Sequence, residues 1–244
     1  SDMASMGAKP VFYNLSLSIP KEKANFFIPR FSSGLREDQE NFNLELIGGD
    51  LTSSPSHINI TISIFGETQG GAFVSRTGAK NGDLLFVSGI LGLAKIGLDN
   101  FNKKSKYLST AKKKYLIPQP RVNLGLLLNN VANSMIDISD GLVQDTTHLA
   151  MNSGLCVELD LNKIPLPNIP NISNNSLLNA ALYGGDDYEL LFSCNPNQEK
   201  YLKKISLTNH IKLTNIGDFK TYEDKFLKFK NTSKFPENKS YLHF

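Results

Sequence analysis

The sequence contains no tryptophan, and it has only two cysteines and four histidines among its 244 residues. Cys156 and Cys194 lie in apolar, strand-like contexts without C-x-x-C spacing, so buried free thiols are expected and a zinc site is disfavoured. The histidines are not part of any G-x-S-x-G or H-E-x-x-H motif. This argues against a serine hydrolase and against a zinc hydrolase.

Several other common signatures are also missing. The chain has no G-x-x-x-x-G-K-[ST] loop and no G-x-G-x-x-G after a strand, so neither a P-loop nor a dinucleotide-binding site is supported. The longest apolar runs stop well short of membrane-spanning length and no signal peptide begins at Ser1, which favours a soluble, cytoplasmic protein without a membrane partner. The net charge of +3 comes from scattered lysines without an aromatic-interleaved basic motif, so no nucleic-acid partner is expected.

The composition is that of a folded chain, with 40% hydrophobic and 20% charged residues. A mixture of strand and helix patterns, with hairpins as well as crossovers, predicts an α+β protein of two-layer α/β domains rather than a doubly wound sheet. Gln69-Gly70-Gly71 is a turn-rich stretch and marks a boundary. We therefore expect one domain over residues 1–70 and a second, α/β domain over residues 71–244.

The first of these domains contains the clearest strand patterns. Residues 11–19 and 58–65 alternate apolar with polar side chains, which predicts two half-buried strands that pair in one sheet. Residues 21–41 favour a helix with a kink or a break at Pro29. Residues 1–8 have the pattern of the last turns of a helix that ends at Gly7, so we expect that the given sequence begins inside a domain.

The most informative stretch is Ser134-Met135-Ile136-Asp137-Ile138-Ser139-Asp140-Gly141-Leu142. An apolar strand ends there in two carboxylates and a hydroxyl, and Ser139 or Asp140 is expected to cap a helix over residues 142–151. Carboxylate oxygens suit Mg²⁺, and free N–H groups at a helix start suit phosphate. One interpretation is a nucleotide and metal site; the other is a cap and a turn with no chemistry.

Two further stretches repeat this design. Gly184-Gly185-Asp186-Asp187 and Gly48-Gly49-Asp50 each place carboxylates after a glycine pair and beside an apolar run. Arg76 precedes an Asn-Gly turn and either reaches a phosphate or is simply solvated. Together these residues form the inventory needed for Mg²⁺-assisted phosphoryl transfer, in which positioning and charge neutralisation dominate.

Six motifs, in order along the whole chain, resemble those of the thiamine-monophosphate kinases. The wider superfamily includes aminoimidazole ribonucleotide synthetase, selenophosphate synthetase and a hydrogenase-maturation protein, and it shares the glycine-aspartate theme. The motif around Asp137 and the later Gly-Gly-Asp-Asp-Tyr-Glu-Leu are more specific to the kinases. The matching segments are residues 2–8, 47–50, 76–83, 118–121, 136–142 and 184–190.

The resemblance implies phosphorylation of thiamine monophosphate to thiamine diphosphate by direct transfer from ATP, with several Mg²⁺ ions and no phosphoenzyme. No residue then acts as a covalent catalyst. A homodimer is also implied, in which strands of the first domain pair across a two-fold axis. Carried over residue by residue, the Mg²⁺ ligands would be Asp2, Asp50, Asp137 and Asp140; the ATP contacts Gly49, Asp50, Arg76 and Ser139; and the substrate contacts Asp186 and Tyr241.

Three departures from the family pattern accompany the resemblance. A segment with its own glycine-aspartate-aspartate motif is expected before Ser1, Leu51 stands where threonine is usual, and Asp186 stands where glutamate is usual. Two other functions therefore stay open: a non-catalytic fragment that binds nucleotide weakly, or another ATP-using enzyme of the superfamily.

Overall fold

The computed structural model describes residues 1–230, which form two compact units. The smaller unit is Ala8–Gly71, and the larger contains Ser1–Gly7 and the described residues from Ala72 onward. The boundary expected after residue 70 falls one residue from the end of the smaller unit. The sequence assigned residues 1–7 to the first domain, whereas the structure groups them with the larger unit, because α1 packs on α5 and β5.

The elements of the smaller unit are β1 (Ala8–Ile19), α2 (Lys21–Phe42), β2 (Glu45–Ser53), β3 (Asn59–Thr68) and the 3₁₀ turn η1 (Gln69–Gly71). The strands of the larger unit are β4 (Leu84–Ser88), β5 (Ala132–Asp137), β6 (Leu155–Leu159), β7 (Leu190–Cys194), β8 (Leu213–Thr221) and β9 (Leu227–Phe229). Its helices are α1 (Asp2–Ser5), α3 (Leu93–Asp99), α4 (Ser109–Leu116), α5 (Val122–Leu128), α6 (Leu142–Ser153), α7 (Asn174–Tyr183) and α8 (Glu199–Asn209), with 3₁₀ turns η2 (Lys106–Leu108), η3 (Leu161–Lys163) and η4 (Pro196–Gln198).

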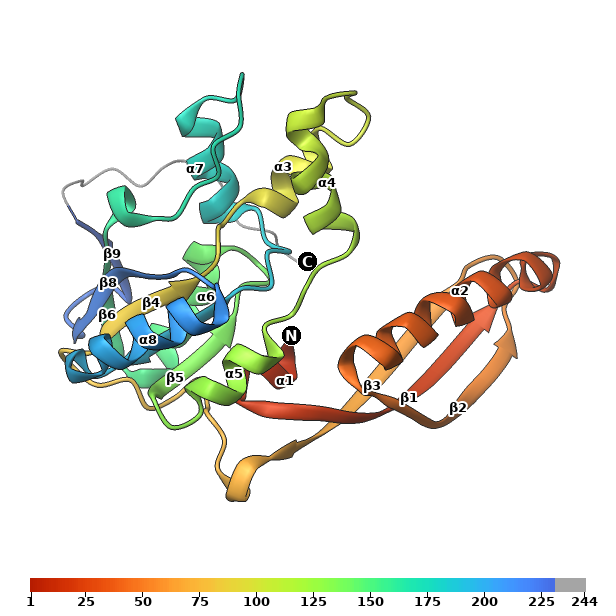
Figure 1. Cartoon of the computed structure of the whole chain (residues 1–244), viewed down its shortest axis with the longest axis horizontal. Helices are drawn as coiled ribbons and strands as arrows, with labels where there is room; N and C mark the ends of the chain where they lie inside the picture. The colour runs from red at the N-terminus through yellow and green to blue at the C-terminus, as the bar shows by residue number, and fades with distance from the viewer. Residues whose placement is uncertain (231–244) are drawn as a thin grey trace. The chain divides into compact units, whose positions relative to one another are not determined.

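In the smaller unit, β1 is the central strand of a three-stranded sheet. It pairs in parallel with β2 and antiparallel with β3, so the predicted pairing of the two alternating strands is confirmed. The helix α2 runs along one face of this sheet (Figure 1), where Gln39 Nε2 donates to the hydroxyl of Tyr13 at 2.7 Å. This is the face that carries the apolar side chains of β1.

The sequence predicts a kink or a break at Pro29, and the break is wrong, since α2 is one helix from Lys21 to Phe42. Proline removes one backbone donor and crowds the preceding turn. Two contacts hold the helix together there: Arg30 Nη1 donates to the carbonyl of Phe26 at 3.1 Å, and the rings of Phe27 and Phe31 stack 5.3 Å apart. The helix therefore continues through the proline, and both contacts join residues one turn apart on either side of it.

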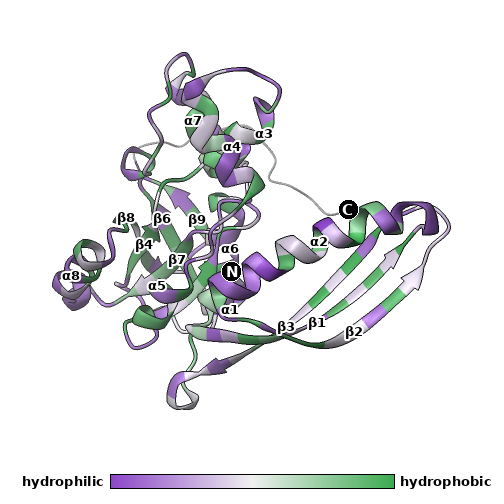
Figure 2. Ribbon diagram, turned by 45° about the vertical axis from the view of Figure 1, so that its right-hand side comes forward, coloured by the Kyte–Doolittle hydropathy of each residue, from purple (hydrophilic) through white to green (hydrophobic). Residues whose placement is uncertain are grey.

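The sheet of the smaller unit leaves much apolar surface uncovered. Every residue of β2 and all but one of β3 are exposed. Ile60, Ile62 and Ile64 alternate with polar residues along β3, a pattern visible in the hydropathy colouring of Figure 2, and each exposes more than two fifths of its surface. By register Ile62 lies opposite Leu15 and shares its face of the sheet. One helix is too narrow to cover all three strands.

The larger unit is built around a six-stranded sheet of order β5-β7-β4-β8-β6-β9. Its strands are apolar on both faces: in β4, Leu85 and Val87 join a core with α6, while Phe86 joins a core with α5 and α8. The predicted α+β fold class is confirmed. Helices on both faces add a third layer to this unit, one more than the two-layer expectation.

Both cysteines of the chain lie in this unit. Cys156 and Cys194 are both buried free thiols, as predicted. No helix within residues 1–230 combines the length and the apolar character needed to cross a membrane.

Candidate functional site

The two acidic motifs of the larger unit lie side by side. β5 and β7 are antiparallel neighbours, with Asp137 opposite Leu190 at the end of the paired region. The pairing continues beyond the strands, because the N–H of Ile138 donates to Glu189 O at 2.9 Å and the N–H of Tyr188 donates to Ile138 O at 2.8 Å. One step further, the N–H of Asp186 donates to Ser139 O at 2.9 Å. Backbone hydrogen bonds thus join two segments about fifty positions apart in one continuous ladder, from the strands into the loops that carry the acidic motifs.

Glycine makes this close approach possible. Gly185 has φ of 65°, and a Cβ atom there would lie 2.4 Å from the carbonyl oxygen of Ser139. Asp186 and Tyr188 also adopt positive φ, at 58° and 48°. Such backbone conformations in residues other than glycine cluster at functional sites, where surrounding contacts hold them in place.

The four polar side chains after Gly185 divide into two pairs. Asp187 and Glu189 are buried, whereas Asp186 and Tyr188 are partly exposed, and the hydroxyl of Tyr188 donates to Asp186 Oδ1 at 3.1 Å. Burial, followed by the negative charge of Asp186, raises the pKa of Tyr188 to about 12, and the charges of Asp137 and Asp2 contribute in the same direction. Tyr188 therefore lies within the electrostatic reach of three predicted site residues.

The loop after β5 is held in place by the side chain of a residue in α6. Asp145 Oδ2 accepts the backbone N–H groups of Ser139 and Asp140, each at 3.1 Å, and its side chain is almost fully buried. Burial raises the pKa of Asp145 to about 7, and the nearby negative charges of Asp140 and Asp137 add to this effect. Asp137, Asp140 and Asp145 therefore share one negative field.

The predicted cap of α6 is wrong. The N-cap residue is Gly141, with no side-chain hydrogen bond, rather than Ser139 or Asp140. Because Asp145 already accepts the N–H groups of Ser139 and Asp140, these two donors are directed into the protein. This leaves the carboxylate of Asp140, which accepts a hydrogen bond from Gln144 Nε2 at 3.2 Å, and the hydroxyl of Ser139 as the polar groups of the loop side chains.

The two buried acids of the second motif have structural partners. Asp187 accepts the N–H groups of Gly92 at 2.5 Å and of Ala94 at 3.3 Å, at the start of α3. Burial raises the pKa of Asp187 to about 7. Glu189 is bound by Ser88, Lys114 and Arg121; burial by itself would raise the pKa of Glu189, but the hydrogen bonds and charges of Arg121 and Lys114 hold it below the ordinary value.

Asp137 and Asp2 lie at the edge of this arrangement. Asp137 is the last residue of β5 and only 4% exposed, and its Oδ2 accepts a hydrogen bond from Ser1 Oγ at 2.5 Å. Asp2 is the first residue of α1, a short helix packed on α5 and β5, and is exposed. Within residues 1–230, no group of three or more His, Cys, Asp or Glu side chains is close enough to enclose a metal ion by itself.

Arg76 belongs to a segment that runs beside β5. The N–H of Met135 donates to Ser75 O at 3.0 Å, and Gly78 approaches the carbonyl of Asn133. Asp83 closes the Asn-Gly turn, since its Oδ2 accepts the N–H of Lys80 at 2.9 Å and Nδ2 of Asn133 at 2.8 Å. The guanidinium of Arg76 is exposed and makes no hydrogen bond or ion pair with the described residues.

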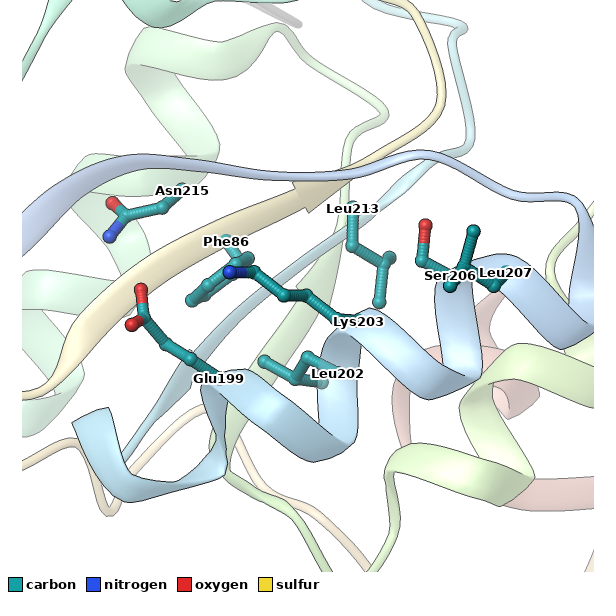
Figure 3. A pocket seen from close by; sticks show the side chains of 8 residues that line it. All are labelled: Phe86, Glu199, Leu202, Lys203, Ser206, Leu207, Leu213 and Asn215. Carbon is teal, nitrogen blue, oxygen red and sulfur yellow. The ribbon is translucent and has the colours of Figure 1, made fainter.

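A groove of about 460 Å³ elsewhere in the larger unit does not involve the predicted site residues. It lies between α8 and the strands β4 and β8 (Figure 3), with apolar side chains on its floor and Glu199 and Lys203 pointing over it. Its lining residues are Phe86, Glu199, Leu202, Lys203, Ser206, Leu207, Leu213 and Asn215.

Comparison with known proteins connects this geometry to a family. The family described as AIR synthase related protein, N-terminal domain, matches residues 1–68. The thiamine-monophosphate kinase of Buchnera aphidicola subsp. Schizaphis graminum is 38% identical over 253 aligned positions, which cover 100% of this chain and 77% of that protein. The chain belongs to the thiamine-monophosphate kinase family.

Solved structures of the family agree with this assignment. The crystal structure of the thiamine-monophosphate kinase from Stenotrophomonas maltophilia K279a superimposes with a TM-score of 0.87 at 29% identity, over 96% of this chain and 76% of that one. A structure of AaThiL complexed with AMPPCP and TMP gives a TM-score of 0.86 at 28% identity, over 99% and 76% of the two chains. The expected resemblance to this family and its fold is therefore confirmed.

The predicted site residues fall into three groups. Asp2, Arg76, Asp137, Ser139, Asp140 and Asp186 belong to the larger unit. Gly49 and Asp50 lie on β2 of the smaller unit, where Gly49 packs so closely on Leu15 of β1 that no Cβ would fit and Asp50 is exposed. Tyr241 lies outside the described residues.

Several residues that hold the two acidic loops in place carry little signal in the sequence. The motifs do not include Asp145, and they contain Asp187, Glu189 and Arg121 without indicating what each of them holds. A signal for Asp145 was available, because an acid in the first turn of a helix can accept N–H groups of the preceding loop. The three partners of Glu189 lie 68, 75 and 101 positions away along the chain, so spacing offers no signal for them.

Proposed function

We propose that this protein transfers the terminal phosphoryl group of ATP directly to thiamine monophosphate, producing thiamine diphosphate. The observation that carries the proposal is the 38% identity to a thiamine-monophosphate kinase over the full length of the chain. The related structure AaThiL complexed with AMPPCP and TMP supports ATP and thiamine monophosphate as the two substrates. Transfer between phosphates requires positioning and neutralisation of charge and needs no covalent intermediate.

We further propose that Mg²⁺ ions serve as cofactors, held by Asp2, Asp137 and Asp140 of the larger unit and by Asp50 of the smaller unit. The donors are all carboxylate oxygens, and Asp137 and Asp140 both contribute negative charge near Asp145. Mg²⁺ commonly binds through one or two carboxylates together with substrate phosphates and waters, so a closed cage of three acids is not required. When bound, Mg²⁺ would neutralise charge on the phosphates.

The remaining residues would bind and orient the two substrates. Arg76 offers a free guanidinium, which suits a phosphate of ATP, and the hydroxyl of Ser139 and the backbone of Gly49 would add further contacts. Asp186, oriented by the hydroxyl of Tyr188, would bind thiamine monophosphate. Tyr241 would contribute an aromatic face suited to a flat heterocycle.

We also propose that the protein forms a homodimer through the smaller unit and works in the cytoplasm, where ATP is available. The exposed isoleucines of β3 and the open edges of the sheet support an interface in this unit. The two strands next to β1 each leave one edge without a hydrogen-bonded neighbour among the described residues.

The test is an assay in which the protein is incubated with thiamine monophosphate, ATP and Mg²⁺. Formation of thiamine diphosphate is measured by chromatography. The proposal expects product that depends on all three components, with ADP released in equal amount. ATP consumption with a different phosphate acceptor would identify another ATP-using enzyme of the superfamily. Weak ATP binding without turnover would point to a non-catalytic chain, and either result would overturn the proposal.

A further inference from the structure

A buried ionic cluster is connected through the backbone to the segments that carry the predicted metal ligands. Glu189 is 1% exposed, and its two carboxylate oxygens accept four hydrogen bonds. Arg121 donates two of them, from Nε to Oε2 at 2.7 Å and from Nη2 to Oε1 at 2.6 Å. Lys114 Nζ donates to Oε1 at 2.9 Å, and Ser88 Oγ donates to Oε2 at 2.6 Å. The forked arginine contact fixes direction as well as distance.

On one side, the cluster is joined to the segment that carries Asp137. The carbonyl of Glu189 accepts the N–H of Ile138 at 2.9 Å, one residue beyond Asp137. The next residue, Leu190, lies opposite Asp137 in the ladder, and its N–H donates to Ser88 Oγ at 2.9 Å. A displacement of Glu189 would therefore shift the end of β5.

On the other side, the cluster is joined to the segment that carries Asp2. Arg121 is the N-cap residue of α5, and its carbonyl accepts the N–H of Gly125 at 2.8 Å. Gly125 lies against α1 so closely that a Cβ there would be 2.1 Å from the carbonyl oxygen of Ala4. Asp2 begins that short helix. The guanidinium of Arg121 therefore anchors the helix on which the segment of Asp2 rests.

Stability alone is a weak reason for such a cluster. Removing two charges from water is costly, and replacing a buried ion pair by apolar side chains of similar volume is often neutral or stabilising. What an apolar replacement cannot reproduce is the fixed geometry of a forked, doubly hydrogen-bonded pair.

We propose that Glu189 and Arg121 are a positioning pair that sets the spacing between Asp2 and the Asp137–Asp140 loop, and thereby the affinity for the divalent cation. The inference rests on the proposed function, in which these three aspartates bind Mg²⁺. Neither Glu189 nor Arg121 is proposed to touch a substrate, so each acts only through the segments that it holds.

The test measures binding of Mn²⁺ alone, by electron paramagnetic resonance, as a spectroscopic probe of the site that does not depend on turnover. Arg121→Lys keeps the charge and removes the forked contact. We expect its Mn²⁺ affinity to fall at least tenfold and the Mg²⁺ concentration for half-maximal activity to rise by a similar factor, with a smaller change in KM for ATP. Arg36→Lys, at an exposed arginine of α2, is the matched control and should equal the wild type.

A second variant distinguishes a loss of metal affinity from a loss of the folded structure. Arg121→Met combined with Glu189→Met and Lys114→Met removes all three charges of the cluster at similar volume, and it should fold while losing Mn²⁺ affinity to the same extent. Wild-type Mn²⁺ affinity in either variant when folded would overturn the proposal, and so would unfolding of both at the assay temperature, because the pair would then only stabilise. If the wild type binds Mn²⁺ but does not phosphorylate thiamine monophosphate, the proposed function fails while the positioning role is still measured.

Discussion

The backbone N–H of Asp140 donates to Oδ2 of Asp145 at 3.1 Å, so a buried acid of α6 supports the loop that precedes its own helix. The same oxygen accepts the N–H of Ser139. The loop is therefore tied to the helix by a side chain rather than by an ordinary cap. These two backbone donors are therefore already used inside the protein and do not face a ligand.

Replacing Asp145 tests this support. Asp145→Ala leaves two N–H groups without an acceptor, and the loss of each buried partner costs about 1–3 kcal/mol. We expect reduced stability in denaturant titrations and at least a tenfold lower kcat, because Ser139 and Asp140 are no longer held in place. Asp145→Asn retains an acceptor oxygen and should lie closer to the wild type in both measurements. Equal stability of the alanine and asparagine variants would contradict this role.

Asp137 and Asp140 are the next pair to test. Asp137→Asn preserves the shape of the side chain at the end of β5 and removes a charge proposed to bind Mg²⁺. Loss of one such preorganised electrostatic group should lower turnover roughly a hundredfold, with little change in thermal stability. Asp140→Ala should likewise weaken Mg²⁺-dependent ATP binding.

Asp99→Asn provides the control for these two variants, since Asp99 forms an exposed ion pair with Lys95 on α3. It should leave turnover and binding unchanged. ATP titrations with and without Mg²⁺ measure how strongly ATP binding depends on Mg²⁺ in each protein. If this dependence is the same in Asp137→Asn, in Asp140→Ala and in the wild type, neither aspartate belongs to the site.

Asp187 predicts a pH dependence of stability. Burial raises its pKa to about 7 in the folded protein, above the ordinary value of 3.8. The folded state therefore favours the protonated carboxyl, and this contribution is fully present below about pH 4 and is lost as the pH rises through about 7. Asp187→Asn removes the titration, so the free energy of unfolding of the wild type relative to this variant should decrease between pH 4.5 and 7.5, by at most about 1.4 kcal/mol per pH unit. A difference that stays constant over this range would contradict the assignment.

The homodimer is tested by the mass of the protein in solution. Light scattering at micromolar concentration should give twice the 27.0 kDa of one chain. If apolar strands of the smaller unit form the interface, raising the salt concentration should not dissociate the dimer, because salt screens charges rather than apolar contacts. A monomeric mass at both salt concentrations would count against dimerisation, and dissociation by salt alone would point to a charged interface.

The sequence by itself determined the family, the mixture of α and β structure and the location of the acidic motifs. The alternation of residues 11–19 and 58–65 was enough to predict two paired strands, because side chains of a strand point to opposite faces with a period of two. The segment from Asp137 to Asp140 was recognisable because its residues are contiguous, and the structure places Asp186 beside it through the paired backbones of the two loops.

Only the tertiary structure decided what each carboxylate faces. Asp186 and Asp187 are neighbours in the sequence, yet the first is partly exposed beside Tyr188 and the second is buried against the start of α3. Residue type reveals that a charge is present, but the partners that compensate a buried charge come from distant segments, as Arg121 does for Glu189. Pro29 shows a different limit: its intrinsic cost is visible in the sequence, but only the structure shows that α2 continues through it from Lys21 to Phe42.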